Sequence, residues 1–306
     1  MNQTEVPHIP VLFEEVIDTF VNLKDGYVID CTLGYGGHSL GILESNPNIK
    51  LICNDQDDEA LAFSKDRLKN YKGRIIFSKG NFKDVINRYK DKNIVGILAD
   101  IGVSSLQLDK NERGFGFNSE TLDMRMDQNQ ELSANTIVNE YSQSQLEHIF
   151  KEYGEVKEYK KVASIIVQHR PFNSAKELAD FLSKKMFKGK LHPATLPFQG
   201  IRIAVNNELG VLEELFEQIE RANFQDTKVA IISFHSLEDR IVKNNFKKWM
   251  QKCICPAHLE RCECGNNHQK GKNLTKKPII PTQAEIKINA RSRSSKMRIF
   301  QFEQRR

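Results

Sequence analysis

Four short apolar segments, rich in β-branched residues, alternate with helical patterns through the first third of the chain. They are "YVIDCTLG" (27–34), "KLICNDQD" (50–57), "RIIFSKGN" (74–81) and "VGILADIGVSS" (95–105). Continuous apolar runs of this length are typical of strands that are buried on both faces. Because helical patterns separate them, we expect a parallel sheet with helices covering both of its faces.

The alternation stops near residue 107. Residues 107–206 have apolar side chains at helical spacing and no convincing strand pattern. A fifth strand pattern, "KVAIISF" (228–234), follows them, and "KMRIFQFE" (296–303) alternates as an antiparallel strand near a sheet edge does. We therefore expect one α/β domain, made of 1–106 and 207–306, that is interrupted by a helical domain at 107–206.

The first strand pattern leads into the glycine-rich stretch "DCTLGYGGHS" (30–39). Glycines at the end of a strand let a ligand approach the backbone closely. A triphosphate-binding loop needs a lysine after its last glycine, and no lysine lies between Lys24 and Lys50. A dinucleotide-binding loop needs a third glycine where Ser39 stands, which weakens that interpretation without excluding it.

Aspartates end the second and fourth strand patterns. Asp55 is placed to accept hydrogen bonds from both ribose hydroxyls of an adenosine, as in enzymes that use NAD or S-adenosylmethionine. Asp100 would lie over the same crevice, where methyltransferases of this architecture keep residues for the reactive end. No tyrosine–lysine pair or well-placed histidine of a hydride-transfer enzyme is apparent. The pattern favours S-adenosylmethionine; the alternative is a tight turn with a helix-capping acid.

Charge is spread unevenly along the chain. The whole sequence has a formal charge of +5, but residues 240–306 hold 17 Lys and Arg against four Asp and Glu. A basic C-terminal quarter on an acidic body indicates a polyanionic partner or, equally, a solvated tail. The N-terminus has no signal-peptide pattern, and no apolar run approaches the roughly 20 residues of a membrane helix. We therefore expect a cytoplasmic protein that does not contact a membrane.

Four of the six cysteines lie in "CICPAHLERCEC" (253–264), as Cys253, Cys255, Cys262 and Cys264. Four thiols in a short polar segment are able to form a tetrahedral zinc site. Cys-x-Cys is a less usual spacing than Cys-x₂₋₄-Cys, and His258 and His268 are alternative ligands. Reduced free thiols are the other interpretation, so the sequence alone does not establish a metal site.

Longer motifs run nearly from end to end of the chain. They are "HIPVL" (8–12), "DCTLGYGGHS" (30–39), "DQD" (55–57), "ADIGVSSLQLD" (99–109), "RGFGF" (113–117), "LDMRMD" (122–127), "HPATLPFQGIRIAVNNEL" (192–209) and "ISFHSLEDRIVK" (232–243). In these segments the chain resembles the ribosomal RNA small subunit methyltransferase H family, also called the MraW family. Near the end, "NARSRSSKMR" (289–298) lacks a proline that the family has.

The resemblance implies a Rossmann-like, class I S-adenosylmethionine-dependent methyltransferase that methylates the N4 amine of a decoding-centre cytidine. It implies that the cofactor contacts Gly36, Gly37, His38, Asp55, Phe82, Asp100 and Gln107. Without the resemblance, Phe82 would be read as a core residue. The resemblance also implies that the inserted helical domain, residues 107–206, recognises the substrate.

The reaction needs an acceptor for a proton of the amine, because the lone pair of an exocyclic amine is delocalised into the ring. Asp100 is the leading candidate, with binding of the cofactor's methionine amine as its alternative role. His235, at the end of the fifth strand pattern, is a second and weaker candidate. The chain contains no Pro-Pro pair, so the Pro-Pro-aromatic motif of many DNA amino-methyltransferases is absent.

Basic residues near the C-terminus are the expected RNA contacts. The residues predicted to grip phosphates are Lys243, Lys247, Lys248, Arg291, Arg293, Lys296 and Arg298, with Lys252 nearby. Phe246 and Trp249 lie among them, but packing of their helix is the favoured role. The expected partner is small-subunit ribosomal RNA, in an assembled or late-assembly subunit, and the sequence leaves monomer and homodimer open.

Two other functions fit the same motifs. One is a methyltransferase of this fold that acts on protein or on another RNA. The other, from a different class, is a non-catalytic RNA-binding or ribosome-assembly factor that retains a cofactor pocket. The set Gly36, Gly37, Asp55 and Asp100 argues against the second, because a pure binding protein would not need all four.

Overall fold

A computed structural model describes residues 10–186, 189, 191–256, 258–259 and 261–304. His8 and Ile9 of the "HIPVL" motif lie outside the described residues. The chain divides into two compact units, one formed by Met1–Gly102 with Val211–Arg306 and the other by Val103–Gly210. The sequence-based boundaries were 106/107 and 206/207. Among the described residues, no helix combines the length and apolar character that crossing a bilayer requires.

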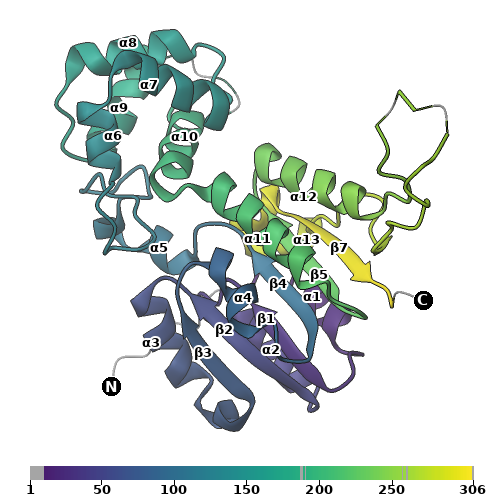
Figure 1. Cartoon of the computed structure of the whole chain (residues 1–306). Helices are drawn as coiled ribbons and strands as arrows, with labels where there is room; N and C mark the ends of the chain where they lie inside the picture. Colours follow the sequence, from purple (N-terminus) through teal and green to yellow (C-terminus); the bar gives the residue numbers. More distant parts are fainter. Residues whose placement is uncertain (1–9, 187–188, 190, 257, 260, 305–306) are drawn as a thin grey trace. The chain divides into compact units, whose positions relative to one another are not determined.

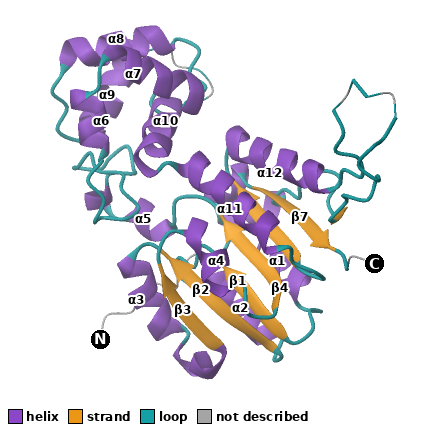
Figure 2. Ribbon diagram, viewed as in Figure 1, coloured by secondary structure: helices purple, strands orange, loops and turns teal. Residues whose placement is uncertain are grey.

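The first unit contains a seven-stranded sheet of order β3-β2-β1-β4-β5-β7-β6 (Figures 1 and 2). Its strands are β1 (Gly26–Asp30), β2 (Ile49–Asp55), β3 (Ile75–Lys79), β4 (Ile94–Asp100), β5 (Lys228–Ser233), β6 (Gly271–Asn273) and β7 (Lys296–Phe302). The first five strands pair in parallel, and β7 pairs antiparallel with both β5 and β6. The five predicted parallel strands and the antiparallel strand are confirmed; β6 was not predicted.

Helices cover both faces of this sheet (Figure 1). They are α1 (Phe13–Phe20), α2 (Gly37–Ser45), α3 (Asp58–Arg67), α4 (Val85–Tyr89), α11 (Glu208–Ala222), α12 (Ser236–Trp249) and α13 (Gln283–Ile288), with turns η1 (Lys69–Arg74), η2 (Phe82–Asp84) and η5 (Ala290–Ser294). One core joins the sheet to α1, α2 and α3, and a second joins it to α4, α11 and α12. Successive strand residues divide between the cores; Val28 lies in one and Ile29 in the other. The apolar runs are continuous because both faces are buried.

The second unit is helical around its own core. Its elements are α5 (Ser105–Asp109), η3 (Asn111–Arg113), α6 (Ala134–Glu140), α7 (Gln143–His148), the π-helical turn η4 (Ile149–Tyr153), α8 (Tyr159–His169), α9 (Ala175–Lys185) and α10 (Thr195–Asn206). Ser142 separates α6 from α7 within the helical pattern of 107–206, because its side chain and that of Gln145 form a capping box at the start of α7.

Hydrogen bonds hold two of the long motifs, "RGFGF" (113–117) and "LDMRMD" (122–127), together as one loop in this unit. The buried Arg113 donates from Nη2 to the carbonyl oxygens of Arg125 and Met126, each at 3.1 Å. Asn206 holds the same segment from α10, because its Oδ1 accepts from Met126 N at 2.8 Å and its Nδ2 donates to Met124 O at 2.8 Å. The unusual residues of "LDMRMD" therefore have a structural role that sequence spacing did not reveal.

Candidate cofactor site

The candidate site lies at the carboxyl ends of β1 and β4. After β1 the chain goes on to β2 and β3 on one side of this strand pair. After β4 it goes on to β5 on the other side, so the strand order reverses between β1 and β4. Open α/β sheets bind ligands in the crevice at such a switch point. Thr32 connects the two strand ends, because its Oγ1 accepts a hydrogen bond from Asp100 N at 2.8 Å.

The loop between β1 and α2, residues 31–36, is called the glycine loop below. Gly36 adopts the left-handed conformation with φ +71°, and it precedes α2 without a side-chain cap. Gly37 is required for another reason, since a Cβ there would clash with the ring of Pro10. Close approach of a ligand was the explanation offered by the sequence; the fold itself supplies a second one.

Asp55 joins the end of β2 to the glycine loop. Its Oδ2 accepts from Gly34 N at 2.8 Å, and its Oδ1 accepts from Asp57 N at 2.9 Å. Burial raises the pKa of Asp55 to about 6, although both backbone hydrogen bonds act to lower it. The carboxylate is thus held in one orientation, with each oxygen keeping a lone pair for a further donor.

Asp30 is a buried carboxylate that sequence reasoning treated only as the end of a strand. Ser39 donates to its Oδ2 at 2.6 Å, and Thr32 N donates to its Oδ1 at 3.2 Å. Burial raises the pKa of Asp30 to about 6. The available signal was an acid at the end of a buried strand, but the pattern does not show that Ser39 and Thr32 are its partners.

His38 and Asp100 face each other across the site. His38 Nε2 donates to Val11 O at 2.9 Å, so the neutral ring leaves Nδ1 as an acceptor. That Nδ1 lies 3.9 Å from Asp100 Oδ2, too far for a hydrogen bond. Burial lowers the pKa of His38 to about 4, so the ring is neutral near pH 7.

Asp100 combines partial exposure with one isolated oxygen. Its side chain is 25% exposed, yet Oδ1 is buried and has no hydrogen-bond partner among the residues that the structure describes. Burial raises the pKa of Asp100 to about 7, and the charges of Asp30 and Glu238 add to the effect. A carboxylate in this state favours a ligand that brings positive charge or hydrogen-bond donors.

The structure brings six of the seven predicted cofactor residues to one unit. Phe82 starts η2, which is separated from β3 by Gly80 and Asn81, and it is partly buried against the core of α4, α11 and α12. Gly80 N donates to Asp55 O at 3.0 Å, which brings the end of β3 to Asp55. Gln107 belongs to the other unit, where its Oε1 accepts from Ser104 N at 3.1 Å.

His235 occupies the first position before α12. Its Nδ1 accepts from Glu238 N at 3.4 Å, while Glu238 Oε2 accepts from His235 N at 3.2 Å, which forms a capping box. His235 Nε2 also lies 3.1 Å from Glu238 Oε1. Capping accounts for this histidine, and its catalytic role stays a prediction that these contacts do not support.

The predicted phosphate contacts fall into three groups. Lys243, Lys247 and Arg293 are exposed and have no ion-pair partner within the described ranges; Arg291 is also exposed. Lys248 pairs with Glu220 at 2.7 Å, and Lys296 lies 3.9 Å from Asp239. Arg298 is a correction, because it is buried and both its Nε and Nη2 donate to Asp239. Its charge is neutralised inside the fold and is not offered to RNA.

The aromatic residues of α12 face the core. Trp249 is 1% exposed and Phe246 is fully buried, and both pack with Phe216 and Phe300. Packing, the favoured role, is therefore confirmed.

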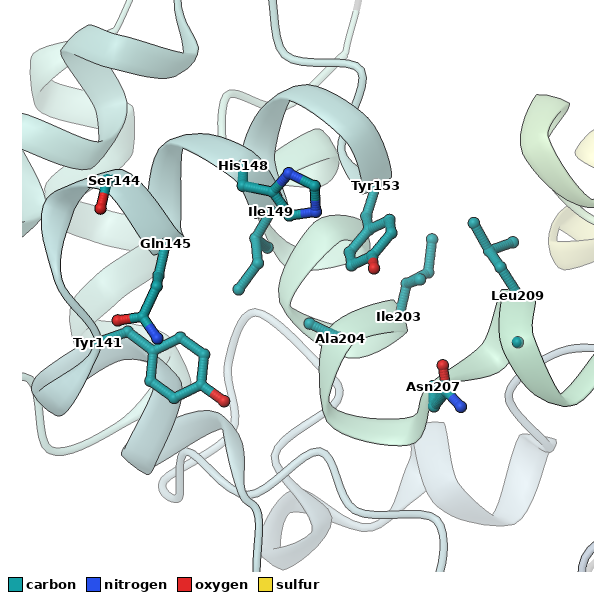
Figure 3. Close-up of a pocket in the computed structure, with 11 residues that line it drawn as sticks. Tyr141, Ser144, Gln145, His148, Ile149, Tyr153, Ile203, Ala204, Asn207 and Leu209 are labelled. Atoms are coloured by element: carbon teal, nitrogen blue, oxygen red, sulfur yellow. The ribbon is translucent and has the colours of Figure 1, made fainter.

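The helical unit has a pocket of its own, of about 400 Å³ (Figure 3). The residues that line it come from the segments around α7, η4, α10 and the start of α11: Tyr141, Ser144, Gln145, His148, Ile149, Tyr153, Ile203, Ala204, Asn207, Leu209 and Gly210. The rings of His148 and Tyr153 meet edge to face, with centroids 5.7 Å apart. Sequence reasoning did not find this pocket, because its aromatic residues follow a helical spacing that equally describes a core.

Comparison with known proteins gives full-length matches. The model of the MraW methylase family matches residues 5–303. Three relatives carry the name ribosomal RNA small subunit methyltransferase H. The protein from Aliarcobacter butzleri is 70% identical over 98% of this chain and 100% of its own length. Those from Sulfurimonas denitrificans and Campylobacter curvus are 57% and 55% identical, and each match covers at least 97% of both chains.

Proposed function

Because this chain belongs to the MraW methylase family, we propose that it methylates the N4 amine of a cytidine in the decoding centre of small-subunit ribosomal RNA. The broader activity, methylation of small-subunit ribosomal RNA with S-adenosylmethionine, follows from the family and from relatives that match end to end. The observation that carries the finer proposal is Asp100, whose Oδ1 is buried without a partner among the described residues at the sheet's switch point.

The charges of the site fit this cofactor. Asp30, Asp55 and Asp100 gather at one edge of the sheet, and each has its pKa raised by burial. A cationic ligand relieves that cost, whereas a polyanionic triphosphate would increase it. S-adenosylmethionine supplies a methyl group on a positively charged sulfur and also carries an ammonium group. In the proposed site, the glycine loop and Asp55 would hold the nucleoside, and His38 Nδ1 and Asp100 would accept hydrogen bonds from the ammonium group.

Asp100 is also the candidate acceptor for the cytidine amine. Its Oδ1 is free to take an N–H hydrogen bond, which would direct the nitrogen lone pair away from the ring and toward the methyl group. The substitution Asp100→Asn separates the two roles. Loss of cofactor affinity with turnover intact at saturating cofactor assigns Asp100 to the cofactor. A loss of turnover with affinity intact assigns it to the amine.

RNA contacts are proposed on both units. On the first unit, exposed Lys243, Lys247 and Arg293 are the cations for phosphates. On the second unit, Tyr141, His148 and Tyr153 give the pocket of Figure 3 the aromatic lining on which single-stranded RNA bases stack. This is the basis on which we assign substrate recognition to the inserted helical unit.

The phosphate contacts have a salt test. For Lys243→Gln/Lys247→Gln, the slope of log affinity against log salt should fall by roughly 1 for each phosphate contact removed. Lys65→Gln/Lys69→Gln, which removes two exposed lysines of the η1–α3 region, is the matched control and should keep the wild-type slope. A flat salt response of the wild type would remove these contacts from the proposal.

The target is tested by methyl transfer from labelled cofactor to unmethylated small subunits and, separately, to free ribosomal RNA. Nuclease digestion and mass spectrometry should locate N4-methylcytidine at one position. A substrate with uridine at that position lacks the amine and should accept no label. Label on a ring carbon or on protein would contradict the proposed target. Absence of transfer to either substrate would favour the non-catalytic assembly factor.

A further inference from the structure

A long loop, residues 250–270, connects α12 to β6 and is called the cysteine loop below. Backbone hydrogen bonds close its base, from His268 N to Lys252 O at 3.0 Å and from Lys270 N to Trp249 O at 2.8 Å. Among its described residues none belongs to a helix or strand and none is buried; Ile254 is 58% exposed. A loop this long without a core of its own is uncommon in a compact domain and requires another source of order.

The four cysteine sulfurs of this loop converge on one point. All lie within 4.8 Å of one another, and Cys264 Sγ is 3.6 Å from Cys262 Sγ and 3.7 Å from Cys253 Sγ. These separations exceed the S–S bond of about 2.05 Å in a disulfide. Four sulfurs at about 2.3 Å from a central zinc ion stand about 3.8 Å apart along the edges of their tetrahedron.

Backbone donors support a thiolate form of the cluster. Ile254 N, inside the first Cys-x-Cys pair, donates to Cys264 Sγ at 3.4 Å. Glu263 N, inside the second pair, donates to Cys255 Sγ at 3.3 Å. Each pair therefore donates an amide hydrogen bond to a sulfur of the other, and amide donors stabilise negatively charged sulfur.

The histidines of the loop are not part of the cluster. His268 Nε2 donates to Cys264 O at 2.8 Å and so fixes the backbone of one ligand, as second-layer partners of metal ligands do. His258 is exposed and lies outside the group of converging ligand atoms. A tetrathiolate site is thus complete without either histidine.

We propose that the four cysteines of this loop bind one zinc ion as thiolates. The set of four soft ligands within a tetrahedral space suits zinc, and multi-iron clusters need their cysteines spread over several metal atoms. Four protein ligands leave no open position, so the site is structural. The bound ion would hold the cysteine loop in one conformation, as buried apolar contacts do elsewhere in the unit.

The test measures metal in the full-length protein without a histidine tag, purified under reducing conditions. Elemental analysis should find about one zinc per chain. Cobalt exchanged into the site should give the sulfur-to-cobalt charge-transfer bands and intense visible bands of a tetrahedral thiolate site. Cys253→Ser/Cys264→Ser should lose the zinc and those bands. His258→Ala is the matched control in the same loop and should retain both.

A second measurement reports on order in the loop without depending on a variant. Arg261 is exposed between the two cysteine pairs, so trypsin reaches it when the loop opens. Removing zinc with a chelator should raise the cleavage rate at Arg261 about tenfold, while re-adding zinc restores protection. Any of three results would overturn the proposal: protein that stays zinc-free in excess zinc, iron in place of zinc, or a cleavage rate at Arg261 that zinc removal does not change.

Discussion

The glycine loop and the cysteine loop belong to the same α/β unit, yet they are held in opposite ways. The glycine loop is fixed by the protein around it, with Ser64 Oγ donating to Gly34 O at 2.7 Å and Arg67 Nη1 donating to Tyr35 O at 3.0 Å. The cysteine loop is tied to the unit at its base, by backbone hydrogen bonds and by the ion pair of Lys270 with Glu220 at 2.9 Å. Around its cysteines the cross-links are internal to the loop, among sulfurs, amides and His268. A loop at the end of a buried strand can take partners from the elements around it, whereas an exposed loop without a core needs the proposed ion.

The two loops also differ in the kind of free-energy cost that must be met to hold each in one conformation. The glycine loop is held by the carboxylates of Asp30 and Asp55 and lies beside Asp100, and burial raises the pKa values of all three to between about 6 and about 7. The site is therefore electrostatically strained before it binds a cation, and ligand binding relieves the strain. The proposed zinc relieves a cost of a different kind, the conformational entropy of a segment without a core.

Asp55→Ala should have the largest effect. The variant removes the acceptor of Gly34 N and Asp57 N and the proposed ribose contact. Each hydrogen bond to a charged group contributes about 1.5–3 kcal/mol, so cofactor affinity should fall about 100-fold or more in calorimetric titration. Asp58→Ala, which removes an exposed acid of α3, is the control. An affinity within threefold of wild type would show that the loop does not depend on Asp55.

Cofactor binding should depend on pH through Asp100. Its folded-state pKa of about 7 means that the carboxyl is largely protonated at pH 6 and must lose that proton to bind a cation. Affinity should rise roughly tenfold between pH 6 and pH 8, because one proton is released. Asp100→Asn should remove that rise. A wild-type affinity that is level over this range would contradict the assignment.

The variant Asp30→Asn tests how much the buried charge of Asp30 lowers the stability of the folded protein. The folded-state pKa of Asp30, about 6, lies above its usual value, so this residue's contribution to stability is fully present in acid and declines as pH rises through about 6. From pH 5 to pH 8 the free energy of unfolding of the variant, relative to wild type, should increase by about 1 kcal/mol. Urea unfolding at both pH values measures it. A pH-independent difference would mean that Asp30 is ionised in the folded protein without cost.

Zinc removal should have the smallest effect on the cofactor site. If the loops are ordered independently, chelation should change cofactor affinity by less than about twofold even though it opens the cysteine loop. Titration of the chelated and zinc-loaded protein with cofactor decides this. If affinity falls on chelation and returns when zinc is added back, the two loops are coupled. They would then not be ordered independently, as the comparison above requires.

The sequence by itself determined the elements. Apolar β-branched runs predicted the five parallel strands, helical spacing predicted the inserted helices, and the aspartates at strand ends marked the site, because side-chain periodicity and turn chemistry are local. The three residues of β6 are too few to show a period. The break before α7 had a local signal, a serine followed by glutamine three residues later, that was outweighed by the helical pattern around it.

Tertiary structure decided which side chains were free to act. Arg298 and Lys243 look alike in sequence, yet the first is paired with Asp239 inside the fold and the second is exposed. His235 caps a helix, while His38 faces Asp100, and the convergence of two cysteine pairs depends on how a loop folds back. Burial and pairing arise between residues distant in the chain, so they follow from packing rather than from any local pattern.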